Sequence, residues 1–325
     1  MAERDPIERL NDALERGEPG APGAPDEQIR ALVALAGRLR FMPREEFRTQ
    51  LRGQLEEKAM AATTATATLP LREGFHSLTP YIIVPGAARF IEFVKQAFGA
   101  EEKFRVPTPD GSRIMHAEVR IGDSMIELSD GNEQYPSRPA SIHLYLPDTD
   151  AAYQRALAAG ATSLHAVEEM PYGERSGSVK DPFGNHWYIA THHGGSHIPE
   201  GLRTVNSYLH PAGADNLIEF LKRAFRAEEV EVYREETGGP IRHAKIRLGD
   251  TILEMGEAHG QYGAMPTGLH YYVPDVDAAY RRALEAGATS IRPPADQPYG
   301  ERGAGVTDPA GNSWFLATPL AARPT

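Results

Sequence analysis

The stretch HAEVRIGDSMIE at residues 116–127 returns as HAKIRLGDTILE at residues 243–254, 127 positions later. In both copies apolar and polar residues alternate on either side of a Gly-Asp pair, which predicts two short strands joined by a tight turn. The same offset relates MPYGER at 170–175 to QPYGER at 297–302. A constant offset over this distance predicts a tandem repeat in which two copies share one backbone.

Each copy predicts the same order of elements twice. In the first copy a strand at 79–84, a helix at 87–98 and strands at 103–106, 114–121 and 124–129 precede a strand at 141–146, a helix at 150–159 and a last strand at 185–190. The chain therefore predicts an α+β fold with four βαβββ-like units. We expect a helical extension and linker at 1–70 and two domains at 71–195 and 200–320.

Composition excludes several classes of protein. A chain of 325 residues has room for two domains. With no Cys, disulfides and thiolate chemistry are excluded, and a net charge of −11 argues against nucleic-acid binding. No apolar run has the length of a membrane span, and no signal peptide is apparent, so we expect a cytoplasmic protein without membrane contact.

The first 70 residues differ from the repeat. Apolar residues at helical spacing predict two or three short amphipathic helices between Gly/Pro/Ala and Ala/Thr linkers. Packing on the main body or on the mate in a homodimer is the favoured role, and contact with a protein partner through residues 1–60 is the alternative.

Period-2 alternation places polar and aromatic side chains on the sheet face that is turned away from the helices. We expect this face to form one hollow per copy that binds a small-molecule ligand. Its predicted lining is Tyr81, His116, Glu118, Glu127, His143 and Tyr188 in the first copy, and Tyr208, His243, Glu254 and His270 in the second.

The Gly-Asp turn predicts which residues face each other across the strands. It puts Glu118 opposite Glu127 in the first copy and Lys245 opposite Glu254 in the second. Opposed carboxylates favour a bound cation, unless they splay apart into water. In the repeated loop, Arg175 and Arg302 are predicted either to close over a substrate or to form an internal salt bridge.

Several strings resemble the vicinal-oxygen-chelate superfamily of glyoxalases, bleomycin-resistance proteins, fosfomycin-resistance enzymes and extradiol dioxygenases. They are TPYIIV at 79–84, AFGAE at 97–101, HAEVRIGDS at 116–124 and IEL at 126–128, and they look most like its phosphonate-operon-B branch, also described as similar to a demethylubiquinone methyltransferase. The resemblance covers about 75–192 and 202–318. It implies two tandem domains, each made of paired βαβββ units that form a curled sheet.

In metal-dependent members of the family, ligands lie on the first and last strands of each unit. The resemblance maps these positions onto Thr79, Glu127, Ser141 and Tyr188 and onto Asn206, Glu254, Gly268 and Phe315, so only the two glutamates match. Two displaced sets have suitable chemistry for zinc, iron, manganese or nickel. They are His116, Glu127 and His143, and His243, Glu254 and His270.

Three functions follow as hypotheses. The first is a metal-assisted lyase, isomerase or dioxygenase acting on an oxygen-rich substrate, with Glu127 or Glu254 as catalytic ligand or general base. The second is a metal-independent protein that sequesters a drug or metabolite, which the missing first-strand histidines favour. The third is a scaffold that uses the N-terminal helices.

Overall fold

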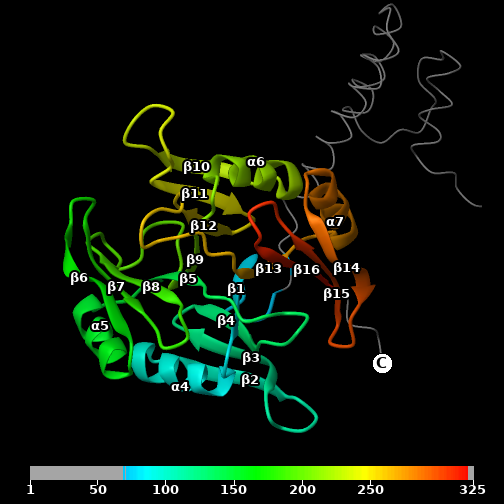
Figure 1. Ribbon diagram of the computed structural model, residues 1–325, viewed down its shortest axis with the longest axis horizontal. Coiled ribbons are helices and arrows are strands. Elements are labelled where there is room, and N and C mark those ends of the chain that lie inside the picture. Colours follow the sequence, from blue (N-terminus) through cyan, green and yellow to red (C-terminus); the bar gives the residue numbers. More distant parts are fainter. Residues whose placement is uncertain (1–68, 70, 321–325) are drawn as a thin grey trace, which may run out of the picture. The chain divides into compact units, whose positions relative to one another are not determined.

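The computed structural model describes residue 69 and residues 71–320, in which four units repeat the order βαβββ (Figure 1). Unit 1 contains β1 (Leu78–Val84), α4 (Ala87–Phe98), β2 (Glu101–Pro107), β3 (Ile114–Ile121) and β4 (Ser124–Asp130). Unit 2 contains β5 (Ser141–Tyr145), α5 (Thr149–Ala158), β6 (Thr162–Met170), β7 (Glu174–Lys180) and β8 (His186–His192).

The second sequence copy repeats this pattern. Unit 3 contains β9 (Val205–Leu209), α6 (Ala214–Phe225), β10 (Glu228–Tyr233), β11 (His243–Leu248) and β12 (Thr251–Met255). Unit 4 contains β13 (Gly268–Tyr272), α7 (Val276–Glu285), β14 (Thr289–Asp296), β15 (Glu301–Thr307) and β16 (Ser313–Pro319). The predicted α+β class with four βαβββ units is confirmed.

The two sheets join units from different sequence copies. Sheet A has the strand order β14-β15-β16-β13-β1-β4-β3-β2 and combines units 4 and 1. Sheet B has the order β10-β11-β12-β9-β5-β8-β7-β6 and combines units 3 and 2. The joints are antiparallel pairs, β1 with β13 and β5 with β9. Each sheet therefore contains half of each copy.

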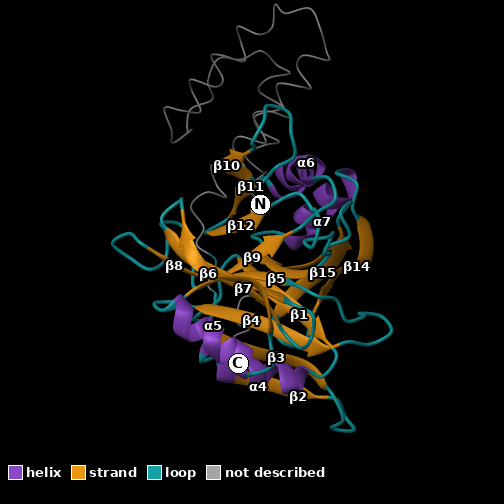
Figure 2. Cartoon of the chain, turned by 60° about the vertical axis from the view of Figure 1, so that its left-hand side comes forward, coloured by secondary structure: helices purple, strands orange, loops and turns teal. Residues whose placement is uncertain are grey.

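The hydrophobic cores follow the copies instead. One core consists almost entirely of apolar side chains from units 1 and 2, among them Phe90 and Trp187, and it also includes Val205 of unit 3. The other consists almost entirely of side chains from units 3 and 4, among them Trp314, and it also includes Leu78 of unit 1. Helix α4 lies beside α5, and α6 lies beside α7, and strands separate these two helix pairs in Figure 2. Each copy is thus held together by its core, and the sheets bind the copies to each other.

Local sequence accounts for the element ends. Helix α4 stops at Gly99, whose φ of 71° is left-handed and suits glycine. Helix α5 starts at Asp148, whose side chain accepts a hydrogen bond from the backbone N–H of Ala151. The predicted turn register is confirmed, since Glu118 faces Glu127 and Lys245 faces Glu254.

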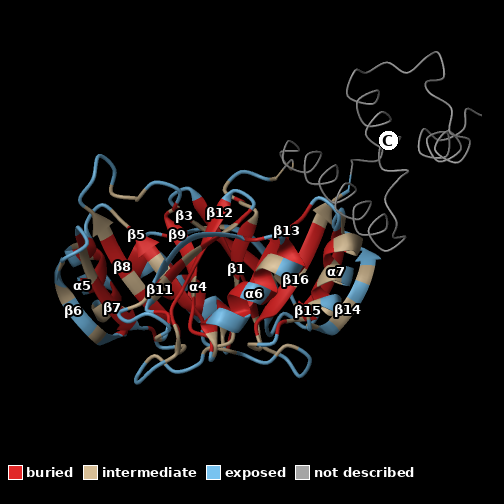
Figure 3. Cartoon of the chain, turned by 90° about the horizontal axis from the view of Figure 1, so that it is seen from above, coloured by how far each residue is buried: buried red, intermediate tan, exposed pale blue. Residues whose placement is uncertain are grey.

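Burial follows the predicted two-faced pattern of the strands. Ala117, Val119 and Ile126 lie in the core under the helices, as Figure 3 shows for the buried parts of the strands. The longest described helices, α4 and α6, have 12 residues each, so none in this part of the chain has the length and apolar character of a membrane span. The predicted helices of residues 1–70, and with them the partner surface at 1–60, fall almost entirely outside the described residues.

Candidate functional site

The polar face of sheet A encloses a cavity of about 820 Å³. We call this cavity and its lining site A, and the equivalent face of sheet B site B. Site A receives residues from unit 1 and unit 4, so both sequence copies build it. Its polar lining includes Arg72, Tyr81, His116, Glu118, Glu127, His270, Arg292 and Glu301.

A buried acid–base pair lies in the wall of site A. The Nδ1 atom of His270 is 2.5 Å from Oε2 of Glu127, and only 9% and 3% of these two residues is exposed. Burial lowers the pKa of His270, but the charge and hydrogen bond of Glu127 outweigh it and leave this pKa above its ordinary value. Glu301 Oε2 lies 3.9 Å from the other ring nitrogen. The imidazole therefore tends to keep its proton between two carboxylates.

Glu118 is the second buried carboxylate of site A. The guanidinium of Arg72 donates to both of its oxygens, at 2.9 and 2.7 Å. Burial works against ionisation of Glu118, but hydrogen bonds from His116 and Arg72 prevail and lower its pKa. The chain itself thus supplies a cation to Glu118, one of the two opposed carboxylates. Arg72 precedes β1 in a segment without periodic pattern, and sequence analysis missed it.

His116 completes a group with metal-ligand chemistry. Its Nε2 atom lies 3.3 Å from Glu118 Oε1 and 3.8 Å from Glu127 Oε1. One donor atom from each of these three residues lies within 4.8 Å of the others. An imidazole and two carboxylates suit a divalent ion such as zinc, iron or manganese. However, Arg72 already binds both carboxylate oxygens of Glu118, and His270 binds Oε2 of Glu127.

Aromatic side chains form much of the remaining wall. The rings of Tyr81 and Phe315 are 5.0 Å apart, and those of Tyr135 and Phe315 are 5.8 Å apart. Tyr81 also lies 3.4 Å from Nδ1 of His116 through its hydroxyl. Burial, with the nearby charge of Glu127, raises the pKa of Tyr81, so its hydroxyl stays protonated and available as a donor.

Site B repeats the acid–base pair. His143 Nδ1 lies 2.9 Å from Oε2 of Glu254, and here too the carboxylate overcomes burial and raises the pKa of the histidine. The pKa of His243, 3.7 Å from Glu254, is lowered because burial dominates. Lys245 faces Glu254 in the strand register, but its ammonium pairs with Glu231 at 3.2 Å.

Aromatic side chains form a cluster in site B as well. The hydroxyl of Tyr188 is 2.7 Å from Nε2 of His210, and the ring of His210 stacks on Tyr262 at 5.6 Å. Tyr208 lies 5.1 Å from Tyr188 and 5.0 Å from His210, ring to ring. Burial lowers the pKa of His210 to about 4, so this cluster is neutral. The equivalents of His210 and Tyr188 in site A are Ile83 and Phe315.

The structure corrects the predicted metal sets. His143 was grouped with His116 and Glu127, and His270 with His243 and Glu254. His143 instead pairs with Glu254 across β9, and His270 pairs with Glu127 across β1. The regrouping follows from the sheet order, which exchanges units between copies. The family ligand positions around site A accordingly become Thr79, Glu127, Gly268 and Phe315, and around site B Asn206, Glu254, Ser141 and Tyr188.

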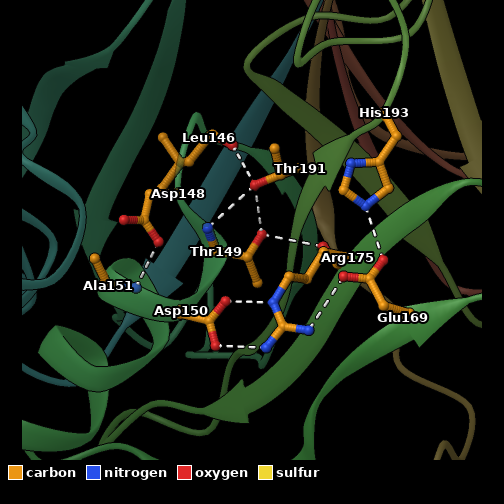
Figure 4. Close-up of polar contacts among 9 residues, drawn as sticks. All are labelled: Leu146, Asp148, Thr149, Asp150, Ala151, Glu169, Arg175, Thr191 and His193. Atoms are coloured by element: carbon orange, nitrogen blue, oxygen red, sulfur yellow. Dashed lines mark hydrogen bonds and ion pairs between the residues drawn. The ribbon is translucent and has the colours of Figure 1, made fainter.

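The two loop arginines form internal ion pairs, which was one of the two predicted roles. Arg175 donates to both oxygens of Asp150 and, at 3.2 Å, to Glu169 (Figure 4). Arg302 repeats this with Asp277 at 2.6 and 2.9 Å and with Asp296 at 2.8 Å. Each guanidinium therefore links a β-hairpin to the first turn of a helix through ion pairs. Arg302 is not among the residues that line the site A cavity.

The glutamate before each of these arginines accepts a hydrogen bond from a tyrosine, and Glu301 also lines site A. Tyr272 donates from its hydroxyl to Glu301 at 2.9 Å, and Tyr145 does the same to Glu174 at 3.0 Å. The repeated Tyr-Gly-Glu-Arg string was the signal that could have found Glu301 and Glu174. Arg292, which also lines site A, had no such signal, because its counterpart in the first copy is His165.

Comparison with known proteins identifies the family of the chain. The family model of the Glyoxalase/Bleomycin resistance protein/Dioxygenase superfamily matches residues 74–189 and 212–316. The chain belongs to this superfamily.

Similar proteins occur in mycobacteria and in maize. An uncharacterized protein of Mycobacterium bovis is 43% identical over 124 residues, which are 35% of this chain and 81% of the relative. An uncharacterized Mycobacterium tuberculosis protein is equally identical over 124 residues, with 72% of its length covered. The crystal structure of glyoxalase I from Zea mays superposes with a TM-score of 0.58 at 16% identity, over 74% of this chain and 92% of that chain. At that identity the likeness shows the fold.

Proposed function

We propose that the protein binds one small organic molecule per chain, in site A. The observation behind this proposal is the cavity of about 820 Å³, which lies against the His270–Glu127 pair and has polar groups on one wall and aromatic rings on another. Concave sites of this volume, largely apolar with a few converging polar groups, are typical of small-molecule sites.

Site B serves as the structural partner of site A in this proposal. The cluster of Tyr188, Tyr208, His210 and Tyr262 lies beside its copy of the acid–base pair, with the rings of Tyr188 and Tyr208 6.4 and 6.5 Å from that of His143. A ligand would have to break the 2.7 Å contact between Tyr188 and His210 to enter the same position. Site A lacks this contact because Phe315 and Ile83 have no polar atoms in their side chains.

The residues of site A would act on the polar end of the ligand. Glu127 uses Oε2 for His270, and its Oε1 lies toward His116 at 3.8 Å. A ligand hydroxyl or acidic C–H at that oxygen would meet a carboxylate whose partner imidazole holds a proton. Sequestration needs only the binding part of this arrangement, and a lyase or isomerase would also use the proton transfer.

A metal-assisted enzyme is the second candidate, and the His116, Glu118 and Glu127 group favours it. These three residues would hold the ion, which would polarise a ligand oxygen. Arg72 would then have to release Glu118, since one carboxylate would otherwise serve both cations. We therefore expect metal affinity to rise when Arg72 is removed.

Titration of the full chain with small organic molecules, with and without metal, tests the proposal. The protein is purified without a His tag, its metal content is measured, and ligand-observed NMR screens a broad fragment set. We expect fragments to bind with a stoichiometry of one, and Phe315→Trp to weaken them more than Tyr188→Trp does. Binding at two equivalent sites, or stronger effects from the site B variant, would contradict the proposal. Stoichiometric metal that His116→Ala and Glu118→Gln both remove would favour the second candidate.

A further inference from the structure

We infer that the ligand of site A is an organic anion, of the carboxylate class, whose charged group binds Arg292. This inference rests on the proposed function and names the substrate class of the same site. It starts from a guanidinium that lines the cavity and has no carboxylate partner among the residues described.

Arg292 lies on β14 and is half-buried at the cavity wall. Its Nε atom is buried and has no hydrogen-bond partner within the described residues. Burial is the main cause that raises the pKa of Tyr81, and the positive charge of Arg292 opposes that rise slightly, so the guanidinium lies within electrostatic range of Tyr81. A half-buried cation without a counter-ion loses hydration without compensation, and an anion in the cavity would restore it.

The carboxylates of site A have other partners. Glu118 is bound by Arg72, and Glu127 by His270. Glu301 accepts from Tyr272, and Asp296, on the same strand as Arg292, pairs with Arg302. The wall therefore leaves Arg292 as a cation for an incoming group. A guanidinium presents its N–H groups as a planar fork that matches a carboxylate.

Site B lacks this feature. The residue equivalent to Arg292 is His165, which is exposed and lies 3.4 Å from Glu168. At two other equivalent positions site A has Phe104 and Met115, where unit 3 has Glu231 and Arg242. These apolar side chains are half exposed at the cavity, at 49% and 51%. Arg113 also lines the cavity without a carboxylate partner among the described residues, but it is exposed and donates to the carbonyl of Gly131. Site A thus combines a half-buried unpaired guanidinium, that of Arg292, with apolar side chains, which suits an anion with an aromatic or aliphatic body.

Matched sets of small aromatic molecules test the inference. Each set contains a carboxylate, its neutral amide of the same shape and an ammonium compound with the same ring, for example phenylacetate, phenylacetamide and benzylammonium, together with two-ring analogues. Binding to the full chain is screened by ligand-observed NMR, and affinities are measured by calorimetry. We expect each bound carboxylate to exceed its amide by at least about tenfold, the effect of one hydrogen bond between charged groups.

Variants then assign the preference to Arg292. Arg292→Gln should weaken the carboxylate by about 10- to 100-fold and leave the amide unchanged. Arg292→Lys should retain part of the preference, because the charge remains without the fork. Arg223→Gln, an equal charge change on helix α6, should change neither ligand. Circular dichroism and thermal unfolding show that each variant is folded.

The outcomes separate this inference from the proposed function. If amides or ammonium compounds bind in site A as tightly as the carboxylates, or if Arg292→Gln keeps the carboxylate preference, the anion inference is wrong and the small-molecule function stands. If no molecule of any class binds and Phe315→Trp changes nothing, both are wrong.

Discussion

Glu127 and His270 are 143 positions apart in the sequence, yet their side chains meet at 2.5 Å. They reach each other across β1, since β4 pairs with one edge of this strand and β13 with the other. The pair thus links the two sequence copies at the wall of site A. Its formation depends on correct joining of units 1 and 4, so it reports on the fold and on the site together.

Glu127→Gln should lower the pKa of His270, because the carboxylate is what overcomes the effect of burial. The folded-state pKa of His270 is raised, so protonation favours folding. This stabilisation is complete below the unfolded value of about 6.5 and is lost as the pH rises through the folded pKa. NMR titration of the His270 ring protons measures the shift directly.

Unfolding by urea tests the same pair energetically. We expect the free energy of unfolding of the native chain to be larger than that of Glu127→Gln by about 2 kcal/mol below about pH 6.5, which is the typical contribution of a hydrogen bond to a charged group. At higher pH the difference should be smaller. His143 is the control for the NMR titration: its partner Glu254 is unchanged in Glu127→Gln, so the pKa of His143 should stay the same. A difference that grows with rising pH would contradict the argument.

Ile83→His with Phe315→Tyr should convert site A into a likeness of site B. The new pair reproduces His210 and Tyr188, which are 2.7 Å apart through their side chains. The double variant should lose ligand binding while its unfolding free energy stays within about 1.5 kcal/mol of the native value, since a neutral hydrogen bond contributes about that much at most. Calorimetry and urea unfolding check both statements. Retained ligand affinity would show that the aromatic cluster does not close a site.

Arg302→Gln should leave ligand affinity within about twofold of the native value. Its guanidinium is committed to Asp277 and Asp296, away from the cavity lining. Arg292→Gln, ten residues earlier, is the matched change at the cavity and should weaken anionic ligands. Calorimetry with the same carboxylate compares the two variants. Equal losses in both would mean that the loop arginine contacts the ligand after all.

Asp181→Ala should destabilise the chain by about 3 kcal/mol. The buried carboxylate accepts hydrogen bonds from the backbone N–H of Phe183 and Asn185 and from Nε1 of Trp187 at 3.0 Å. Removing it leaves several buried donors without a partner, at about 1–3 kcal/mol for each group that stays unsatisfied. Asp308→Ala repeats the change in the second copy, where Trp314 donates at 2.8 Å. A loss below about 1 kcal/mol in urea unfolding would show that water replaces the carboxylate.

Much of the fold was predictable from the sequence, because it depends on local periodicity. Alternation in 114–129 and the Gly-Asp turn fix which residue faces which, and Glu118 does lie opposite Glu127. The apolar face of 87–98 and its terminal glycine predict helix α4 closely. These signals act over a few residues, and the repeat allows each one to be read twice.

The composition of each site could not be predicted, for a physical reason. Units 1 and 3 have the same backbone, as do units 2 and 4, so sheets that join unit 1 to unit 2 or to unit 4 show the same pattern of alternation. The choice between them depends on long-range packing and decides whether Glu127 meets His143 or His270. Arg72 and Arg292 were missed because the repeat does not mark them: the position equivalent to Arg72 is Pro199, and the position equivalent to Arg292 is His165.

Joining the two copies in a single polypeptide has an evolutionary consequence. If two identical chains formed the same sheets, every substitution would appear in both sites at once. A change that improved one site would therefore also change the other in the same way. In this chain a mutation can change Ile83 in site A without changing His210 in site B. One site can therefore specialise while the other keeps the assembly rigid.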